Sequence, residues 1–514
     1  MYSKIYSAAL AGMDCFLVQV ETDVSDGLPH LEMVGALSAE TREARERVRT
    51  ALKNAGVRIP PKRITVSLSP ADRRKEGTGF DLAVAAGILS ALGLAPQTEL
   101  KDAVIAGEVC LDGTVRGVRG VMAMASLARR EGKKRLFVPR ENAGEGAVMD
   151  GLLVIPVDSV SHLLSMWKDE SLCRPVSPPS WEEEIWENGP DFCQIGGQAM
   201  LKRAAETACA GMHNLLMVGS AGAGKSMIAR RIPTILPRLT REESIEISTI
   251  YSIGGYLPAG DGRITIRPFR SPHHTVTAAG LAGGGRIPRP GEMSLAHGGV
   301  LFLDELPEFR SEVLETLRQP LEDRKLTLVR AGASYEFPAD FILVAAMNAC
   351  RCGYYPDRNL CRCTEGEIHR YLGRLSRPLL DRLDICVEVT KATYGELSQG
   401  GETSAAIRSR VERAVKRQRE RFRGTGIRFN ARIPVSDLER FCPLDERAEG
   451  LLQKVYEKLT FSARGLHSLR RVARTLADLE EKEVIGYEHV NEAVFYRSFG
   501  ERLWMAGGAD DGGV

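Results

Sequence analysis

The 514-residue sequence lacks any apolar run of roughly 20 residues, the length that a membrane-spanning helix needs. Its longest weakly polar run, residues 82–95, contains Gly and Ser, and we interpret it as a buried helix. The N-terminus also lacks an apolar core followed by a small-residue cleavage site, which argues against a secretory signal. These absences predict a cytoplasmic protein with no membrane partner.

Net charge is small as well. A net charge of +2 does not by itself indicate a nucleic-acid partner, because binding depends on where charge is concentrated. Hydrophobic residues make up 43% and charged residues 26%, which excludes a disordered chain. The eleven cysteines are an odd number and mostly lie in apolar stretches, as expected for reduced thiols. The length predicts about three domains.

Domain boundaries are predicted from shifts in composition. Residues 173–190 are rich in Pro, Ser, Trp and Glu and indicate a linker. Residues 1–172 alternate β-rich runs with helical patterns, as in an α+β or α/β domain. Residues 191–392 contain short, continuous apolar runs typical of a parallel sheet buried on both faces, which predicts an α/β core. Residues 393–505 read as a polar helical domain, and residues 506–514 as a tail.

A glycine-rich segment follows one of these apolar runs and precedes a helical one. In such a loop, glycines let backbone N–H groups surround phosphate oxygens, Lys225 reaches the terminal phosphates, and Ser226 can bind Mg²⁺. The alternative is a glycine-rich turn without a ligand. The predicted ATP-binding residues are Gly219, Ser220, Ala221, Gly222, Ala223, Gly224, Lys225 and Ser226.

An acidic pair ends the apolar run at residues 300–303. A buried strand would deliver Asp304 to Mg²⁺, while Glu305 would polarise the attacking water as the catalytic base. Alone, this pattern is weak and equally consistent with a structural strand end. Its position after the phosphate loop predicts the second half of an ATP site.

Two further residues are candidates for catalysis. Asn348 stands at the tip of the next apolar run, where it would hold the attacking water or merely cap a strand. Arg382 lies among apolar residues, where it would stabilise transition-state charge in a neighbouring subunit's site. The alternative for Arg382 is an internal salt bridge with Asp381 or Asp384.

Three segments, residues 271–275, 290–309 and 377–384, closely resemble magnesium-chelatase-like AAA+ ATPases. With the N-terminal domain included, nearly the whole chain resembles the YifB/ComM family of bacterial proteins, associated with competence and DNA branch migration. The resemblance implies a P-loop core with a helical lid, assembled as a homo-hexameric ring. It assigns Asn348 to sensor 1, Arg382 to the arginine finger supplied in trans, and Arg464 to sensor 2. From sequence alone, Arg464 would be a solvated helix residue.

Residues 325–338 read as a β-hairpin, which relatives place in the central channel of the ring. Lys325 and Arg330 would then contact phosphates, unless they are ordinary surface charges.

The N-terminal domain resembles the proteolytic domain of Lon-type proteases through residues 75–85 and 107–118. That family uses a serine activated by a lysine, and both partners are needed. The aligned positions here are Gly79 and Met122, which predicts a proteolytically inactive domain with a scaffolding or binding role.

Four cysteines fall in a loop rich in Gly, Tyr, Pro and Asp directly after Asn348: Cys350, Cys352, Cys361 and Cys363. Clustered thiols suggest a structural Zn²⁺ site, although C-x-C spacing is less diagnostic than C-x-x-C and reduced thiols are the alternative.

Residues 408–432 concentrate positive charge, with ten Lys or Arg against two Glu. This is either a track for DNA phosphates or a solvated basic helix, since few aromatic residues accompany the charge.

Together these features predict an ATP- and Mg²⁺-dependent ring motor that acts on branched or single-stranded DNA. The alternatives are a magnesium-chelatase-type metal-insertion chaperone, disfavoured because those relatives lack the N-terminal domain, and a protein-remodelling ATPase.

Overall fold

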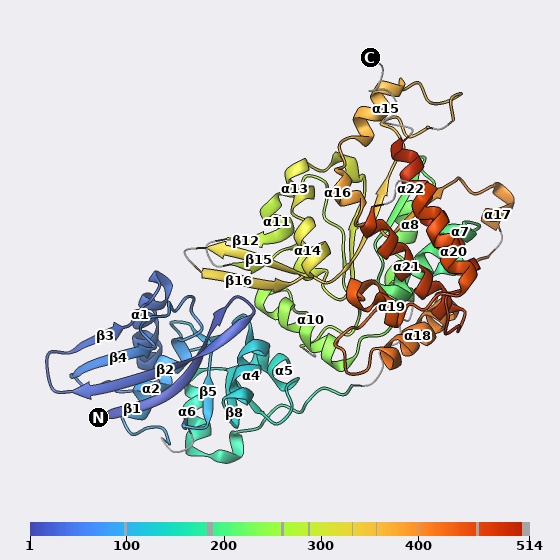
Figure 1. Ribbon diagram of the computed structural model, residues 1–514. Coiled ribbons are helices and arrows are strands. Elements are labelled where there is room, and N and C mark those ends of the chain that lie inside the picture. The colour runs from blue at the N-terminus through green and yellow to red at the C-terminus, as the bar shows by residue number, and fades with distance from the viewer. Residues whose placement is uncertain are drawn as a thin grey trace.

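The computed structural model describes residues 1–96, 100–181, 189–258, 262–285, 288–330, 333–355, 357–398, 400–458 and 462–505. Part of the predicted linker, residues 182–188, and the whole predicted tail, residues 506–514, lie outside these described residues. The chain builds one sheet near its N-terminus, a second sheet in its middle, and a helical C-terminal region beside the second sheet (Figure 1).

Among the described residues, the N-terminal sheet has seven strands in the order β3-β4-β2-β1-β5-β8-β9. Strands β1 and β2 form a long antiparallel hairpin, while β5, β8 and β9 extend the sheet in parallel. The strands are β1 (Tyr2–Ala11), β2 (Asp14–Ser25), β3 (His30–Val34), β4 (Arg63–Ser69), β5 (Ala103–Ile105), β8 (Arg135–Pro139) and β9 (Leu153–Val157), with a small separate hairpin of β6 (Glu108–Val109) and β7 (Val115–Arg116).

Helices cover this sheet. They are α1 (Ala39–Asn54), α2 (Asp81–Ala91), α4 (Val121–Arg130), α5 (Arg140–Ala147) and α6 (Val160–Lys168). Every residue of α2 is buried, so the buried helix predicted for residues 82–95 is confirmed as far as Ala91. An all-apolar helix of this kind fits where both of its sides contact protein.

The second sheet is parallel throughout, and its order is β11-β14-β17-β10-β18 among the described residues. Its strands are β10 (Leu215–Gly219), β11 (Phe269–Arg270), β14 (Val300–Leu303), β17 (Ile342–Met347) and β18 (Ile385–Val389). Every residue of β10, β14 and β17 is buried, which explains their continuous apolar character and confirms the predicted parallel sheet. Because neighbouring parallel strands end at one edge, the loops after β10, β14 and β17 meet there.

Short helices and hairpins connect these strands. They are α7 (Ala199–Gly211), α8 (Lys225–Ala229), α9 (Ile232–Ile235), α10 (Arg241–Gly254), α11 (Ala278–Ala282), β12 (Gly283–Gly284), β13 (Arg289–Pro290), α12 (Glu292–Leu295), α13 (Ser311–Glu315), α14 (Arg318–Asp323), β15 (Lys325–Arg330), β16 (Ala333–Pro338), α15 (Glu365–Leu372), α16 (Arg377–Leu380) and α17 (Tyr394–Ser398).

The hairpin predicted for residues 325–338 is confirmed, since β15 and β16 pair antiparallel from Lys325↔Pro338 to Arg330↔Ala333. Lys325 forms an ion pair with Glu336 across the hairpin at 2.7 Å. The side chain of Arg330 lies outside what the structure describes.

The C-terminal region is helical, as predicted. It contains α18 (Ser404–Arg421), α19 (Leu438–Phe441), α20 (Glu446–Lys458), α21 (Ala463–Leu479) and α22 (Tyr487–Met505). One apolar cluster joins α18, α21 and α22 to α7 and to the second sheet, so these helices share a core with it. None of the helices in the described ranges combines the length and apolar character needed to cross a membrane.

Asp384, immediately before β18, fastens α21 to the sheet. Its carboxylate accepts hydrogen bonds from Ser468 Oγ on α21 at 2.5 Å and from the Asn214 backbone N–H at 3.0 Å, with the His213 ring 3.8 Å away. Burial alone would raise the pKa of Asp384, but these polar partners hold it well below its ordinary value. The ionised carboxylate therefore stabilises the fold.

We expect Asp384→Ala to lower the free energy of unfolding at pH 7 by about 2–3 kcal/mol, because hydrogen bonds to a buried charge are lost. Since the pKa of Asp384 is lowered by folding, its contribution is complete above the ordinary carboxyl pKa of about 4 and declines as pH falls below it. Urea unfolding at a series of pH values should therefore show the two proteins converging in acid. Asp323→Ala, at an exposed position, is the control; a deficit that is equal at every pH would contradict this assignment.

The N-terminal region packs on α10 of the middle region, beside α4 (Figure 1). The Gly120 backbone N–H donates to the Ser252 carbonyl at 3.2 Å, and Ser252 Oγ also contacts the buried carboxylate of Glu145. On the other side, Gly12 in the β1–β2 turn lies against the ring of Tyr335 in the β15–β16 hairpin. The two regions are thus joined by polar and apolar contacts.

Gly79 and Met122, the positions aligned to the protease dyad, lie just before α2 and in the first turn of α4. Met122 is buried, and its backbone N–H donates to Glu145 Oε1 at 2.8 Å. Lys75, in the same resembling segment, is buried, and its ammonium donates to the Arg73 carbonyl at 2.8 Å.

Candidate nucleotide-binding site

The glycine-rich loop joins the end of β10 to α8. Gly222 and Gly224 adopt φ values of +76° and +90°, which L side chains rarely tolerate, so the loop path depends on glycine there. α8 begins at Lys225 directly after this turn. The predicted strand, loop and helix are therefore present in the order that phosphate binding requires.

Lys225 is only 8% exposed, and its ammonium lies inside the loop. It donates to the carbonyls of Gly219 at 2.7 Å and Ser220 at 2.9 Å, and to Asn348 Oδ1 at 3.1 Å. Burial lowers the pKa of Lys225, while the negative charge of Asp304 acts in the opposite direction. The structure thus brings the loop lysine and Asn348, at the end of β17, into direct contact.

Ser226 and Asp304 also meet. The Ser226 hydroxyl donates to Asp304 Oδ2 at 2.6 Å, and Asp304 Oδ1 accepts from the Glu305 backbone N–H at 3.0 Å. Hydroxyl and carboxylate oxygens are the hard ligands that Mg²⁺ prefers, so this donor pair fits a magnesium ion beside bound phosphates.

Glu305 directly follows Asp304 in the chain. Its side chain is 60% exposed, and its backbone adopts φ +53°, an unusual value for a residue other than glycine. The carboxylate lies 3.6 Å from His274 Nδ1, and the His274 ring is stacked obliquely on His273 with centroids 4.0 Å apart. The neighbouring histidine would orient the carboxylate that we predict as the base.

His274 was not predicted as a site residue, although a signal was present. The segment at residues 271–275 follows β11, which pairs in parallel with β14. Polar residues after β11 therefore reach the same sheet edge as Asp304 and Glu305.

Arg382 and Arg464 lie together because both contact the carboxylate of Glu322. Lys225, in contrast, contacts Asn348. Arg382 Nη2 is 2.5 Å and Arg464 Nη1 3.5 Å from Glu322 Oε2 on α14. The internal salt bridge predicted as the alternative for Arg382 is present, but with Glu322 in place of Asp381 or Asp384: Asp381 pairs with Arg497 at 3.3 Å, and Asp384 accepts a hydrogen bond from Ser468.

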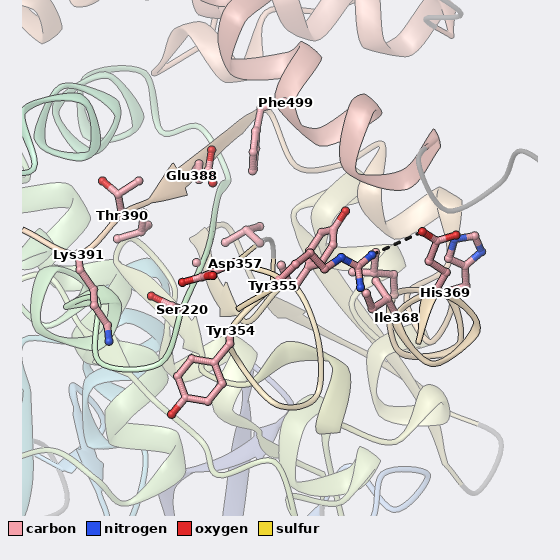
Figure 2. A pocket seen from close by; sticks show the side chains of 17 residues that line it. Ser220, Tyr354, Tyr355, Asp357, Ile368, His369, Glu388, Thr390, Lys391 and Phe499 are labelled. Carbon is pink, nitrogen blue, oxygen red and sulfur yellow. Dashed lines mark ion pairs between the residues drawn. The ribbon is translucent and has the colours of Figure 1, made fainter. Parts of the chain in front are cut away.

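A cavity of about 880 Å³ adjoins the phosphate loop at Ser220 (Figure 2). Its walls come from the segments that follow β17 and β18, including Tyr354, Thr390 and Lys391, with Phe499 of α22 on another side. This volume is within the usual range for small-molecule sites, roughly 300–1,000 Å³. The rest of a nucleotide therefore has room beside its phosphates.

The four clustered cysteines, Cys350, Cys352, Cys361 and Cys363, also come together, with all four sulfurs within 4.8 Å of one another. They follow Asn348 directly, so this cluster borders the nucleotide site.

The basic segment at residues 408–432 is partly neutralised within the chain. Five of its ten cations form ion pairs with carboxylates: Arg410 with Glu206 and Glu402, Arg413 with Glu481, Arg421 with Asp478, Arg428 with Glu246, and Arg432 with Asp340. The charge excess that suggested a phosphate track is therefore smaller on the folded surface than in the sequence.

Comparisons with known proteins agree with this geometry. Family models described as "Magnesium chelatase, subunit ChlI", "Subunit ChlI of Mg-chelatase" and "Magnesium chelatase, subunit ChlI C-terminal" match residues 191–397, 20–142 and 401–497 respectively. The N-terminal region is thus matched by a magnesium-chelatase model, and its likeness to Lon proteases stays a prediction.

Two individual relatives match nearly the whole chain, and a third matches part of it. "Competence protein ComM" of Haemophilus influenzae is 39% identical over 501 residues, which is 96% of this chain and 97% of that protein. "Uncharacterized protein YifB" of Escherichia coli is 37% identical over 504 residues, 98% of each chain. "Magnesium-chelatase 38 kDa subunit" of Acidiphilium rubrum is 25% identical over 335 residues, 58% of this chain and 87% of that protein. The chain therefore belongs to the magnesium-chelatase-related family that includes ComM and the YifB proteins.

Proposed function

We propose that this protein is a cytoplasmic AAA+ ATPase that forms a ring and uses ATP hydrolysis to act on DNA. The observation that carries the ATPase is the convergence of four side chains, Lys225, Ser226, Asp304 and Asn348, through direct hydrogen bonds. They belong to loops after three neighbouring parallel strands, so their meeting follows from the fold. A phosphate-binding loop with a carboxylate and a polar residue at this edge is the arrangement that nucleotide hydrolysis needs.

Each residue has a distinct role. Lys225 leaves the loop carbonyls to bind the terminal phosphates, and Asn348 positions the attacking water. Ser226 and Asp304 would hold Mg²⁺, which would supply positive charge to neutralise the phosphates. Glu305, beside His274, accepts a proton from water as it attacks. The cavity next to Ser220 takes the nucleoside.

In a homo-hexameric ring, the two arginines that contact Glu322 would have a function in ATP hydrolysis. Arg382 and Arg464 both contact Glu322, whereas Lys225 contacts Asn348. We infer that Arg382 serves the ATP site of a neighbouring subunit as the arginine finger, and that Arg464 is the sensor 2 arginine of the lid.

DNA is the substrate that the family relationship favours, because a full-length relative is a competence protein. The motor would move branched or single-stranded DNA, as in helicase action or branch migration, with the β15–β16 hairpin lining the channel. A metal-insertion chaperone is less well supported, since the match to the 38 kDa chelatase subunit covers 58% of this chain. A protein-remodelling ATPase is the third candidate.

The proposed organisation keeps the predicted boundaries: an N-terminal domain at 1–172, an ATPase core at 191–392 and a lid at 393–505. We propose that the N-terminal domain has a Lon-like origin and binds a partner without cleaving peptides. Gly79 offers no nucleophile, and the Met122 side chain no base.

The test compares ATP hydrolysis with forked DNA, four-way DNA, unfolded protein or no addition. We expect branched DNA to stimulate hydrolysis, and DNA binding to weaken steeply with salt because phosphate contacts release counterions. Lys225→Ala should remove hydrolysis under every condition, while Lys454→Ala, at an exposed lysine, should not. Stimulation by unfolded protein alone would favour remodelling, and no hydrolysis at all by the wild-type chain would remove the motor proposal.

A further inference from the structure

The four clustered cysteines have the spacing of a metal site. Sulfur–sulfur distances are 3.2 Å between Cys350 and Cys352, 3.7 Å between Cys350 and Cys361, and 3.6 Å between Cys352 and Cys361. Four thiolates at about 2.3 Å from one zinc ion in tetrahedral geometry are separated by about 3.8 Å. All four are free cysteines, and a disulfide would bring two sulfurs to about 2.05 Å. The cluster is therefore near the size of a filled site.

The backbone also contacts a sulfur of the cluster. The Tyr355 N–H donates to Cys350 Sγ at 3.4 Å. Gly353, directly after Cys352, adopts φ +83° and lets the chain turn back. Backbone donors to sulfur stabilise thiolates, which are the form that binds metal.

The cysteine loop is mostly exposed between its buried ends. Cys350 and Cys361 are buried, but most of the described residues between them, including Arg351, Asp357 and Asn359, are exposed. Exposed residues contribute little burial to offset the ordering entropy of such a segment. A metal crosslink between its two ends would supply the missing constraint.

This loop touches the phosphate loop at two points. Asn348, two residues before Cys350, accepts the hydrogen bond from Lys225, and the Gly353 carbonyl accepts one from the Ala221 backbone N–H at 3.3 Å. Gly353 is also close to Asn348: a Cβ on Gly353 would lie 3.6 Å from Asn348 Nδ2. The first cysteine pair thus lies between the two contacts.

We propose that Cys350, Cys352, Cys361 and Cys363 bind one structural Zn²⁺, and that this ion braces the phosphate loop through Asn348 and Gly353. The zinc site stands on the sulfur geometry alone, whereas the bracing rests on the proposed ATPase. Thiolate-only coordination leaves no open position for water, so the ion has no part in hydrolysis.

The first experiment measures the metal content of the purified full-length chain and of Cys361→Ser/Cys363→Ser. We expect close to one zinc per wild-type chain, loss of zinc from the double variant, and full zinc in Cys110→Ser, whose thiol lies outside the cluster. Cobalt exchanged into the wild-type chain should show thiolate-to-cobalt charge transfer and the intense visible bands of tetrahedral Co²⁺. Because cobalt exchange uses the wild-type chain, it does not depend on folding of the variant. Wild-type zinc no higher than in the double variant, or an octahedral cobalt spectrum, would overturn the zinc site.

The second experiment measures binding of a fluorescent ATP analogue to the same proteins. We expect zinc loss to weaken binding ~10-fold, equivalent to about 1.4 kcal/mol. Unchanged binding by a folded, zinc-free variant would overturn the bracing role. If the wild-type chain holds zinc but binds no ATP, the proposed ATPase and the bracing role fail while the zinc site stands.

Discussion

Arg382→Ala is expected to lower ATP hydrolysis by ~10³-fold or more, the usual effect of removing an arginine finger. The guanidinium is 8% exposed and is held by the carboxylate of Glu322 and by the Pro378 carbonyl. We expect it to be delivered to a neighbouring subunit's phosphates, where its charge stabilises the transition state. Steady-state ATPase assays on assembled protein measure the loss, and assembly itself is checked by sizing.

Mixing separates an action across the interface from an internal one. Lys225→Ala chains retain Arg382, and Arg382→Ala chains retain Lys225, so a mixed ring contains some interfaces with both groups. With equal amounts of the two variants and random assembly, about a quarter of all subunit interfaces combine a Lys225 from one chain with an Arg382 from the next. Hydrolysis should return in proportion to these interfaces. Arg377→Ala, at an exposed arginine in α16 five residues before Arg382, is the matched control and should stay active. If mixing restores nothing, the contact with Glu322 is the true function of Arg382.

The contacts among the residues of the candidate nucleotide site were largely predictable because each of its parts is local in sequence. The glycine loop, the Asp304–Glu305 pair and Asn348 each end a short apolar run, and parallel strands bring such ends to one edge. Their positions in the sequence were therefore enough to predict that they meet at this edge. The predicted strands β10, β14 and β17 are wholly buried for the same reason.

Contacts between distant elements could not be predicted in this way. Glu322 meets Arg382 across 60 residues of sequence, and nothing in α14 marks it as a partner. Counting charge along the sequence likewise missed the long-range ion pairs of the folded chain, since Arg410 and Arg428 pair with Glu206 and Glu246 from elements about 200 residues earlier. A count along the sequence gives the charge of a segment. A track for DNA phosphates instead requires cations that stay unpaired after folding.

Glu305→Gln is expected to slow hydrolysis by ~10²–10⁴-fold while leaving ATP binding nearly intact, because glutamine keeps the shape of the side chain but cannot accept a proton. The structure separates the two functions. Asp304 contacts Ser226, whereas the Glu305 carboxylate is exposed and faces His274. The variant should therefore hold ATP and accumulate as a nucleotide-bound ring. Single-turnover hydrolysis and fluorescent-nucleotide binding, measured on the same preparation, distinguish this result from that of Lys225→Ala, which should lose both.

Glu308→Gln is the matched control, since Glu308 lies three residues further on and forms an ion pair with Arg374 at 3.1 Å instead of facing the histidine. We expect it to hydrolyse ATP at close to the wild-type rate. His274→Ala should fall between the two variants, because it removes the residue that orients the base and leaves the base in place. If Glu305→Gln turned over as fast as Glu308→Gln, the base would have to lie elsewhere. The left-handed backbone at Glu305 would then have no catalytic explanation.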